Sequence, residues 1–112
     1  MAEDKGVLSV EEVDVELGSL ERWSREGVII SRDFVLANFG DITAFLQHLV
    51  GTIAAQNHHP DFSLDTGTRT VAVSVTTHSE GAVTRADIDF ARALNAWSPQ
   101  RQRYDRASVP PR

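Results

Sequence analysis

The spacing of apolar and polar residues predicts two helices in the first half of the chain. Over residues 9–20 apolar side chains recur every three or four positions with acidic residues between them. Ser9 and Glu12 form a capping-box pattern, which is typical of a helix start. Residues 42–56 carry the most regular amphipathic stripe, and Asp41 stands where a helix cap is expected.

The rest of the pattern indicates four strands and a third helix. The strands are a short extended piece from Trp23 and segments over residues 28–36, 62–65 and 70–77, the last with clear period-two alternation. A helix with one apolar face is expected after Thr84. The order α-β-β-α-β-β-α predicts an α+β domain, with three helices packed on one face of a four-stranded antiparallel sheet.

Length and composition limit the classes of function. The 112 residues suffice for one small domain, and no apolar run approaches the roughly 20 residues of a membrane span. The net charge of −5 argues against a direct nucleic-acid binder, which needs a basic surface. The absence of cysteine excludes disulfides and thiolate metal sites. Because the acidic first residues do not resemble a signal peptide, we expect a cytoplasmic protein.

Charge is distributed unevenly along the chain. The first 21 residues carry seven acidic side chains and one lysine, whereas residues 98–112 carry four arginines, one aspartate and three prolines. We therefore expect a domain over residues 1–97 and a basic, proline-containing tail over residues 98–112. The tail is either a solvated extension or a segment that docks on an acidic surface of a protein partner or a second subunit.

Three of the four histidines fall at junctions between predicted elements. His58 and His59 follow the second helix and His78 follows the last strand, so an antiparallel layout can bring them together. Asp87 could project toward the same place, although its spacing from Thr84 also fits a capping box. Imidazole suits acid–base chemistry because its ordinary pKa of about 6.5 lets one ring donate a proton and another accept one near neutral pH.

Other roles for the histidines stay open. His58 and His59 could be surface residues, and His78 could satisfy a carbonyl at a strand end. Two histidines and a carboxylate could also bind a metal ion, but neighbouring histidines on an extended chain point to opposite sides, which makes joint ligation difficult. His48 lies off the apolar stripe of its helix, so we expect it to face solvent without a function.

Together these residues resemble the signature of the pterin-4a-carbinolamine dehydratases. The resemblance rests on residues 57–61 (Asn-His-His-Pro-Asp), residues 76–78 (Thr-Thr-His), Thr84 and Asp87, and it covers residues 8–97. It implies the same α-β-β-α-β-β-α fold and a homodimer or homotetramer. The implied reaction dehydrates 4a-hydroxytetrahydropterin to quinonoid dihydropterin, which recycles the pterin of aromatic amino-acid hydroxylases. The resemblance implies no metal ion and no organic cofactor.

The resemblance also implies roles for individual residues. His58, His59 and His78 match the family's catalytic histidines, and Asp87 matches its active-site aspartate. One imidazolium would protonate the leaving hydroxyl while one imidazole removes the neighbouring ring proton, with the assignment between the histidines left open. The residues that match the family's pterin-contacting segments are His58, His59, Pro60, Thr77, His78, Ser79 and Glu80.

The chain departs from the family pattern at three places. Ala54 stands where an acidic or other polar residue is usual, and residues 64–66 contain no aromatic side chain where one is usual. The hairpin between His59 and His78 is also longer than usual, around residues 65–67. A second function therefore stays open, that of a non-catalytic assembly or binding factor. It would be similar to relatives that act as a dimerisation cofactor for a homeodomain transcription factor or that assist Rubisco assembly. The retained histidines and Asp87 favour the dehydratase.

Overall fold

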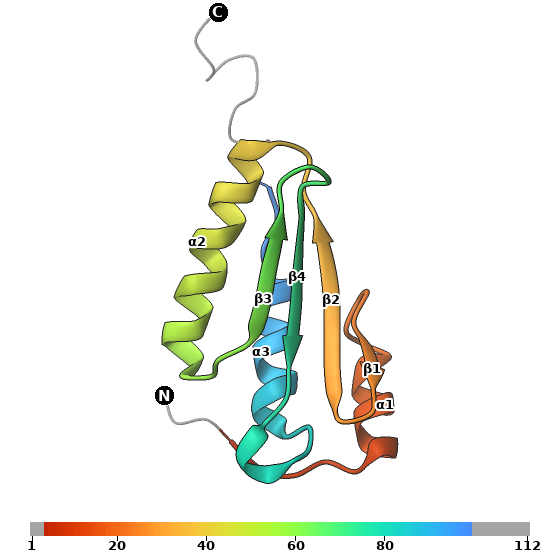
Figure 1. The fold of residues 1–112 in the computed structure, drawn as a ribbon. Coiled ribbons are helices and arrows are strands. Elements are labelled where there is room, and N and C mark those ends of the chain that lie inside the picture. The colour runs from red at the N-terminus through yellow and green to blue at the C-terminus, as the bar shows by residue number, and fades with distance from the viewer. Residues whose placement is uncertain (1–3, 100–112) are drawn as a thin grey trace, which may run out of the picture.

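The computed structural model describes residues 4–99 (Figure 1). In chain order the elements are α1 (Val10–Leu17), β1 (Ser24–Glu26), β2 (Ile29–Val35), α2 (Phe39–Gln56), β3 (Asp61–Asp65), β4 (Thr70–Val75), the 3-10 turn η1 (His78–Glu80) and α3 (Arg85–Asn95). The predicted α+β class and element order are confirmed. Beyond its first two residues, the predicted tail lies outside the described residues. No helix within residues 4–99 is long and apolar enough to cross a membrane.

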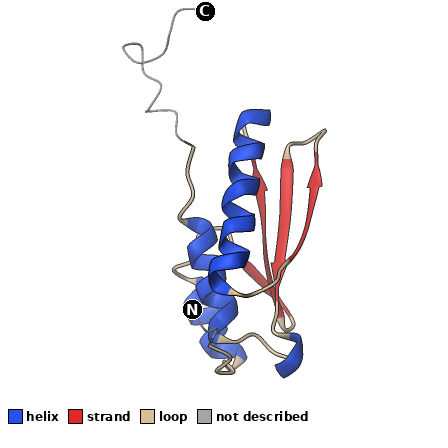
Figure 2. Cartoon of the chain, turned by 90° about the vertical axis from the view of Figure 1, so that its left-hand side faces the viewer, coloured by secondary structure: helices blue, strands red, loops and turns tan. Residues whose placement is uncertain are grey.

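The four strands form one antiparallel sheet in the order β1-β2-β4-β3, and all three helices lie on one side of it (Figure 2). Strand β4 alternates as predicted, with Val71, Val73 and Val75 buried beneath the helices. The register places Phe34 of β2 opposite Val71 and Ile30 opposite Val75, so the apolar residues of both strands share one face. Fully burying one such side chain contributes roughly 1.5–3 kcal/mol, which explains why this register forms.

Helices α2 and α3 cover the apolar face of the sheet. Phe45 and Leu49 of α2 and Ile88 and Phe90 of α3 are completely buried. The Phe45 ring lies 4.5 Å, between centroids, from that of Phe34 on β2, so α2 packs directly against a central strand. The four-residue spacing of Phe45 and Leu49, repeated in α3 by Phe90 and Leu94, supplies the apolar stripe that the sheet requires.

Helix α1 is tied to α3 by charged side chains. Glu16 accepts hydrogen bonds from Arg85 and Arg92 of α3, each at 3.1 Å. The hydrogen bond from Arg85, together with the positive charges of both arginines, holds the pKa of Glu16 below its ordinary value of 4.5. This small network joins α1 to the first residue and to the last turn of α3.

The ends of α2 differ in part from the prediction. The cap is Asn38 rather than Asp41, because the Asn38 side chain accepts a hydrogen bond at 2.8 Å from the Asp41 backbone N–H and α2 begins at Phe39. A capping residue must lie outside the helix, and either polar residue fits that requirement on sequence alone. At the other end Asn57 adopts the left-handed conformation with φ 52°, which reverses the chain into His58.

Candidate active site

A buried carboxylate at the start of α3 organises the histidine region. Asp87 is completely buried, and its Oδ2 accepts the backbone N–H of Thr84 and the hydroxyl of Thr77, both at 2.8 Å. Its Oδ1 lies 2.5 Å from Nε2 of His58. The hydroxyls of Thr77 and Thr84 lie 2.7 Å apart and extend the network. The capping box predicted for this helix is therefore present, and the same carboxylate also binds a histidine.

His58 is held inside the protein by this carboxylate. Only 6% of the residue is exposed, and its ring lies edge-on to Phe90, with 6.1 Å between ring centroids. Because a carboxylate only accepts hydrogen bonds, we expect His58 to donate a proton from Nε2 to Asp87. This contact fixes the orientation of the imidazole and determines which nitrogen carries the proton when the ring is neutral.

The other two predicted histidines, His59 and His78, are exposed at the surface next to His58. All three border a hollow of about 200 Å³. Its lining residues are Lys5, His58, His59, Thr76, Thr77, His78 and Ser79. The site thus combines one imidazole held by a buried partner with two that are open to solvent, an arrangement that can both donate and accept protons near neutral pH.

The structure brings together most, but not all, of the residues implied by the resemblance. Pro60 and Glu80 do not line the hollow, and the hydroxyl of Thr77 is engaged by Asp87. The expectation that His48 faces solvent was wrong. Its ring is half-buried between α2 and α3, where Nε2 lies 3.0 Å from the carbonyl oxygen of Ala93. Helix α2 therefore contacts α3 over a wider part of its surface than its apolar stripe indicates.

Lys5 is a residue of the hollow that the sequence did not reveal. The segment before α1 pairs with the segment before α3 through a hydrogen bond from Leu8 N–H to the Val83 carbonyl at 3.0 Å. This pairing brings the Lys5 ammonium to 3.4 Å from the hydroxyl of Ser79. Nothing in the residue pattern marks such an isolated pairing, so Lys5 could be found only from the structure.

Within residues 4–99 no group of three or more histidine, cysteine, aspartate or glutamate side chains is arranged to hold a metal ion. His58 turns toward Asp87 on the inside of the domain, while His59 lies exposed. The divergence expected for neighbouring histidines on an extended chain accounts for this difference in burial.

The structure is thus an α+β domain in which three histidines border one surface hollow. Residues 6–97 match the sequence model of the family described as Pterin 4 alpha carbinolamine dehydratase. The chain belongs to this family, as its motifs predicted.

Known proteins similar to this chain cover most of its length. A Roseiflexus protein named "Putative pterin-4-alpha-carbinolamine dehydratase" is 36% identical over 88 residues, covering 79% of this chain and 92% of the relative. A Mycobacterium avium protein of the same name is 34% identical over 89 residues, covering 80% and 93%. The crystal structure of a "transcriptional coactivator/pterin dehydratase" from Brucella melitensis superposes with a TM-score of 0.75 at 29% identity, covering 81% of this chain and 97% of that one.

We predict that Asp87→Asn lowers the free energy of unfolding by at least about 2 kcal/mol, measured by urea denaturation. An amide cannot accept hydrogen bonds at both of its terminal atoms, so at least one of the buried donors on Thr77, Thr84 or His58 loses its acceptor. The matched control is Asp89→Asn, an exposed aspartate on the same helix, which we expect to change stability by less than about 0.5 kcal/mol. Equal, small effects of the two substitutions would show that the network is not formed.

Proposed function

We propose that this chain dehydrates 4a-hydroxytetrahydropterin to quinonoid dihydropterin. The observation that carries the proposal is the hollow in which one buried histidine, held by Asp87, lies beside the exposed His59 and His78. Membership of the pterin-4a-carbinolamine dehydratase family supports the substrate class. The chemistry of a carbinolamine needs only proton donors and acceptors at close range, which these imidazoles supply.

In the proposed reaction a proton is added to the C4a hydroxyl, which leaves as water, and a proton is removed from the neighbouring ring N–H. One imidazolium and one imidazole are sufficient, each contributing roughly 10²–10⁴-fold. His59 and His78 are the candidates for direct proton transfer because both rings are exposed at the hollow. His58 is the positioning histidine in this scheme, since its Nε2 is already engaged by Asp87.

We expect His59→Ala and His78→Ala each to lower turnover at least about 100-fold, because each removes a proton-transfer group. The assay mixes chemically generated 4a-hydroxytetrahydropterin with the purified protein and follows dehydration optically against the uncatalysed background. Thermal midpoints should stay nearly unchanged, since both side chains are exposed. His48→Ala is the matched control that removes a histidine outside the hollow and should retain turnover.

Two results would count against the proposal. If the unchanged, folded protein does not accelerate the dehydration, the chain is not a dehydratase. If the two variants lose activity only in proportion to lost stability, the histidines are structural.

A second candidate function is a non-catalytic binding role. The Brucella relative carries both "transcriptional coactivator" and "pterin dehydratase" in its description. In this chain Ala54, exposed near the end of α2, supplies no polar side chain where family members usually have one. A folded protein without dehydratase activity would favour this second function over the first.

We also infer that the chain forms a homo-oligomer through β3. In the described part of the chain this strand is at the edge of the sheet and pairs with β4 alone, and all five of its residues are exposed. Phe62 and Leu64 lie opposite Val73 and Val71, so they extend the apolar face of the sheet beyond its helical cover. They are 46% and 37% exposed, which leaves an apolar edge that a second copy of the chain would bury.

Phe62→Glu is expected to lower the molar mass measured by light scattering to that of the monomer, because a charge at this position opposes burial of the apolar edge. The matched control is Ser63→Glu, which places the same charge on the opposite face of the same strand and should leave the oligomer intact. A monomeric unchanged protein, or an unaltered mass for Phe62→Glu, would rule out this interface.

A further inference from the structure

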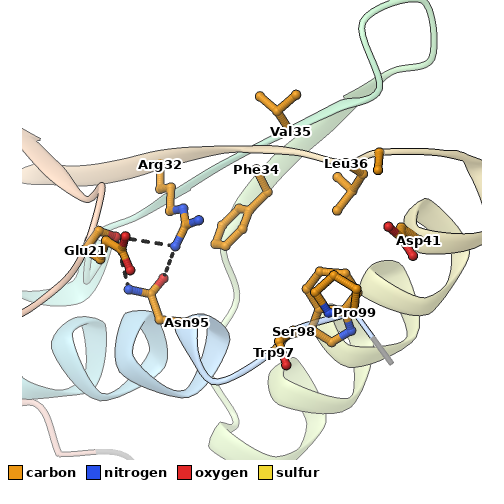
Figure 3. A pocket seen from close by; sticks show the side chains of 11 residues that line it. Glu21, Arg32, Phe34, Val35, Leu36, Asp41, Asn95, Trp97, Ser98 and Pro99 are labelled. Carbon is orange, nitrogen blue, oxygen red and sulfur yellow. Dashed lines mark hydrogen bonds between the residues drawn. The ribbon is translucent and has the colours of Figure 1, made fainter. Parts of the chain in front are cut away.

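A second pocket lies at the opposite end of α3 from the histidine hollow (Figure 3). Asp87 is in the first turn of α3 and Asn95 is its last residue, roughly 12 Å further along the helix axis. Beside Asn95, residues of β2, of the first turn of α2 and of the chain after α3 enclose a cavity of about 290 Å³. No residue lines both cavities, so the second pocket is separate from the proposed active site.

The guanidinium of Arg32 is the main polar group of this pocket. Its Nη1 donates to Oδ1 of Asn95 at 2.7 Å and to the backbone carbonyl of Glu21 at 3.4 Å. Its Cζ lies 4.1 Å from the centroid of the Phe34 ring, a distance at which the cation and the aromatic face attract each other. The Nε–H group is buried and has no hydrogen-bond acceptor among residues 4–99.

No acidic side chain within residues 4–99 forms an ion pair with Arg32. Glu21 accepts a hydrogen bond from Arg32 through its backbone carbonyl, whereas its exposed carboxylate lies 4.0 Å from Nε of Arg22. Burial, and then the positive charge of Arg22, lowers the pKa of Arg32, and the negative charge of Glu21 opposes this shift. A partly buried cation is most stable when a negative charge contacts it, so an anion in the adjoining cavity would supply the close ion pair that Glu21 does not form.

The other walls of the cavity indicate which kind of anion fits. In Figure 3, Arg32 lies beside the Phe34 ring, with Leu36, Trp97 and Pro99 further along the pocket. A cavity of about 290 Å³ is at the small end of the range for small-molecule sites, and its aromatic lining suits a single ring. Asp41 also lines the cavity, and its negative charge disfavours a multiply charged anion such as phosphate.

We propose that this pocket binds a small aromatic monocarboxylate. Its carboxylate pairs with the guanidinium of Arg32 through the donor hydrogens that Asn95 and the Glu21 carbonyl leave available. Its ring occupies the part of the pocket that Phe34 and Trp97 line. The proposal is independent of the dehydratase activity, because it uses none of the residues of the histidine hollow.

The test is a titration of the ¹⁵N-labelled full-length protein with benzoate, followed by NMR. We expect saturable shifts of the Trp97 indole N–H and the Asn95 side-chain amide, with a Kd of about 1 mM or tighter. Benzyl alcohol has the same ring without the charge and should bind at least about tenfold more weakly. Inorganic phosphate should not bind at these residues.

Arg32→Gln should weaken benzoate binding at least about tenfold. The matched control is Arg22→Gln, which removes the same charge from a neighbouring arginine that does not line the pocket, and which should keep the affinity. His59→Ala should also bind benzoate like the unchanged protein. If thermal unfolding shows that Arg32→Gln does not fold, the comparison of benzoate with benzyl alcohol in the unchanged protein decides the question.

Three results would each overturn the proposal. Benzoate could produce no saturable shifts at Trp97 and Asn95, or benzyl alcohol could bind as tightly as benzoate. Phosphate could bind these residues more tightly than benzoate, which would assign the pocket to a different class of anion.

Discussion

The buried carboxylate of Asp87 connects segments that are far apart in the sequence. It caps α3 through the Thr84 backbone, binds the end of β4 through Thr77, and holds His58 at the junction of α2 and β3. A carboxylate in this position would cost several kcal/mol without such donors. The three segments therefore meet at Asp87. The position of the candidate active site follows from the hydrogen bonds that this buried carboxylate requires.

The alternation of β4 determines which residues face this carboxylate. Val71, Val73 and Val75 are buried, and the same period continues to Thr77, whose hydroxyl reaches Asp87 on the inside of the domain. His78 follows Thr77 and is exposed. The strand thereby separates an internal hydrogen-bond network from an exposed imidazole. The neighbouring His58 and His59 are divided in the same way, the first buried and the second exposed.

Periodic patterns were sufficient to predict the fold, because burial of an apolar face imposes a period of two on strands and 3.6 on helices. The spacing of Thr84 and Asp87 likewise predicted a capping box, since its donors lie within one helical turn. A contact made at a single point between distant segments produces no periodic or short-range pattern in the sequence. Lys5 reaches the hollow through an isolated backbone pairing, and Arg32 reaches Asn95 across the domain. The sequence likewise did not show whether Asn38 or Asp41 caps α2, because the answer depends on the residue at which the helix begins.

Helix α3 supports both cavities, with Asp87 near its first turn and Asn95 at its end. At the first end the fold places neutral and titratable donors around a buried anion, whereas at the other it places neutral acceptors around a partly buried cation. The first cluster is hydrogen-bonded within the protein, whereas the second borders a cavity of about 290 Å³. An aromatic ring lies beside each cluster, Phe90 against His58 and Phe34 against Arg32.

The most direct test of this account is the protonation of His58 in the intact protein at neutral pH, read by ¹⁵N NMR of the imidazole ring. We predict a proton on Nε2 that exchanges slowly with solvent, because Asp87 accepts it inside the domain. The signal should be lost in Asp87→Asn. An unprotonated Nε2, or a proton that exchanges as fast as those of the exposed His59 and His78, would contradict the central role of the buried pair.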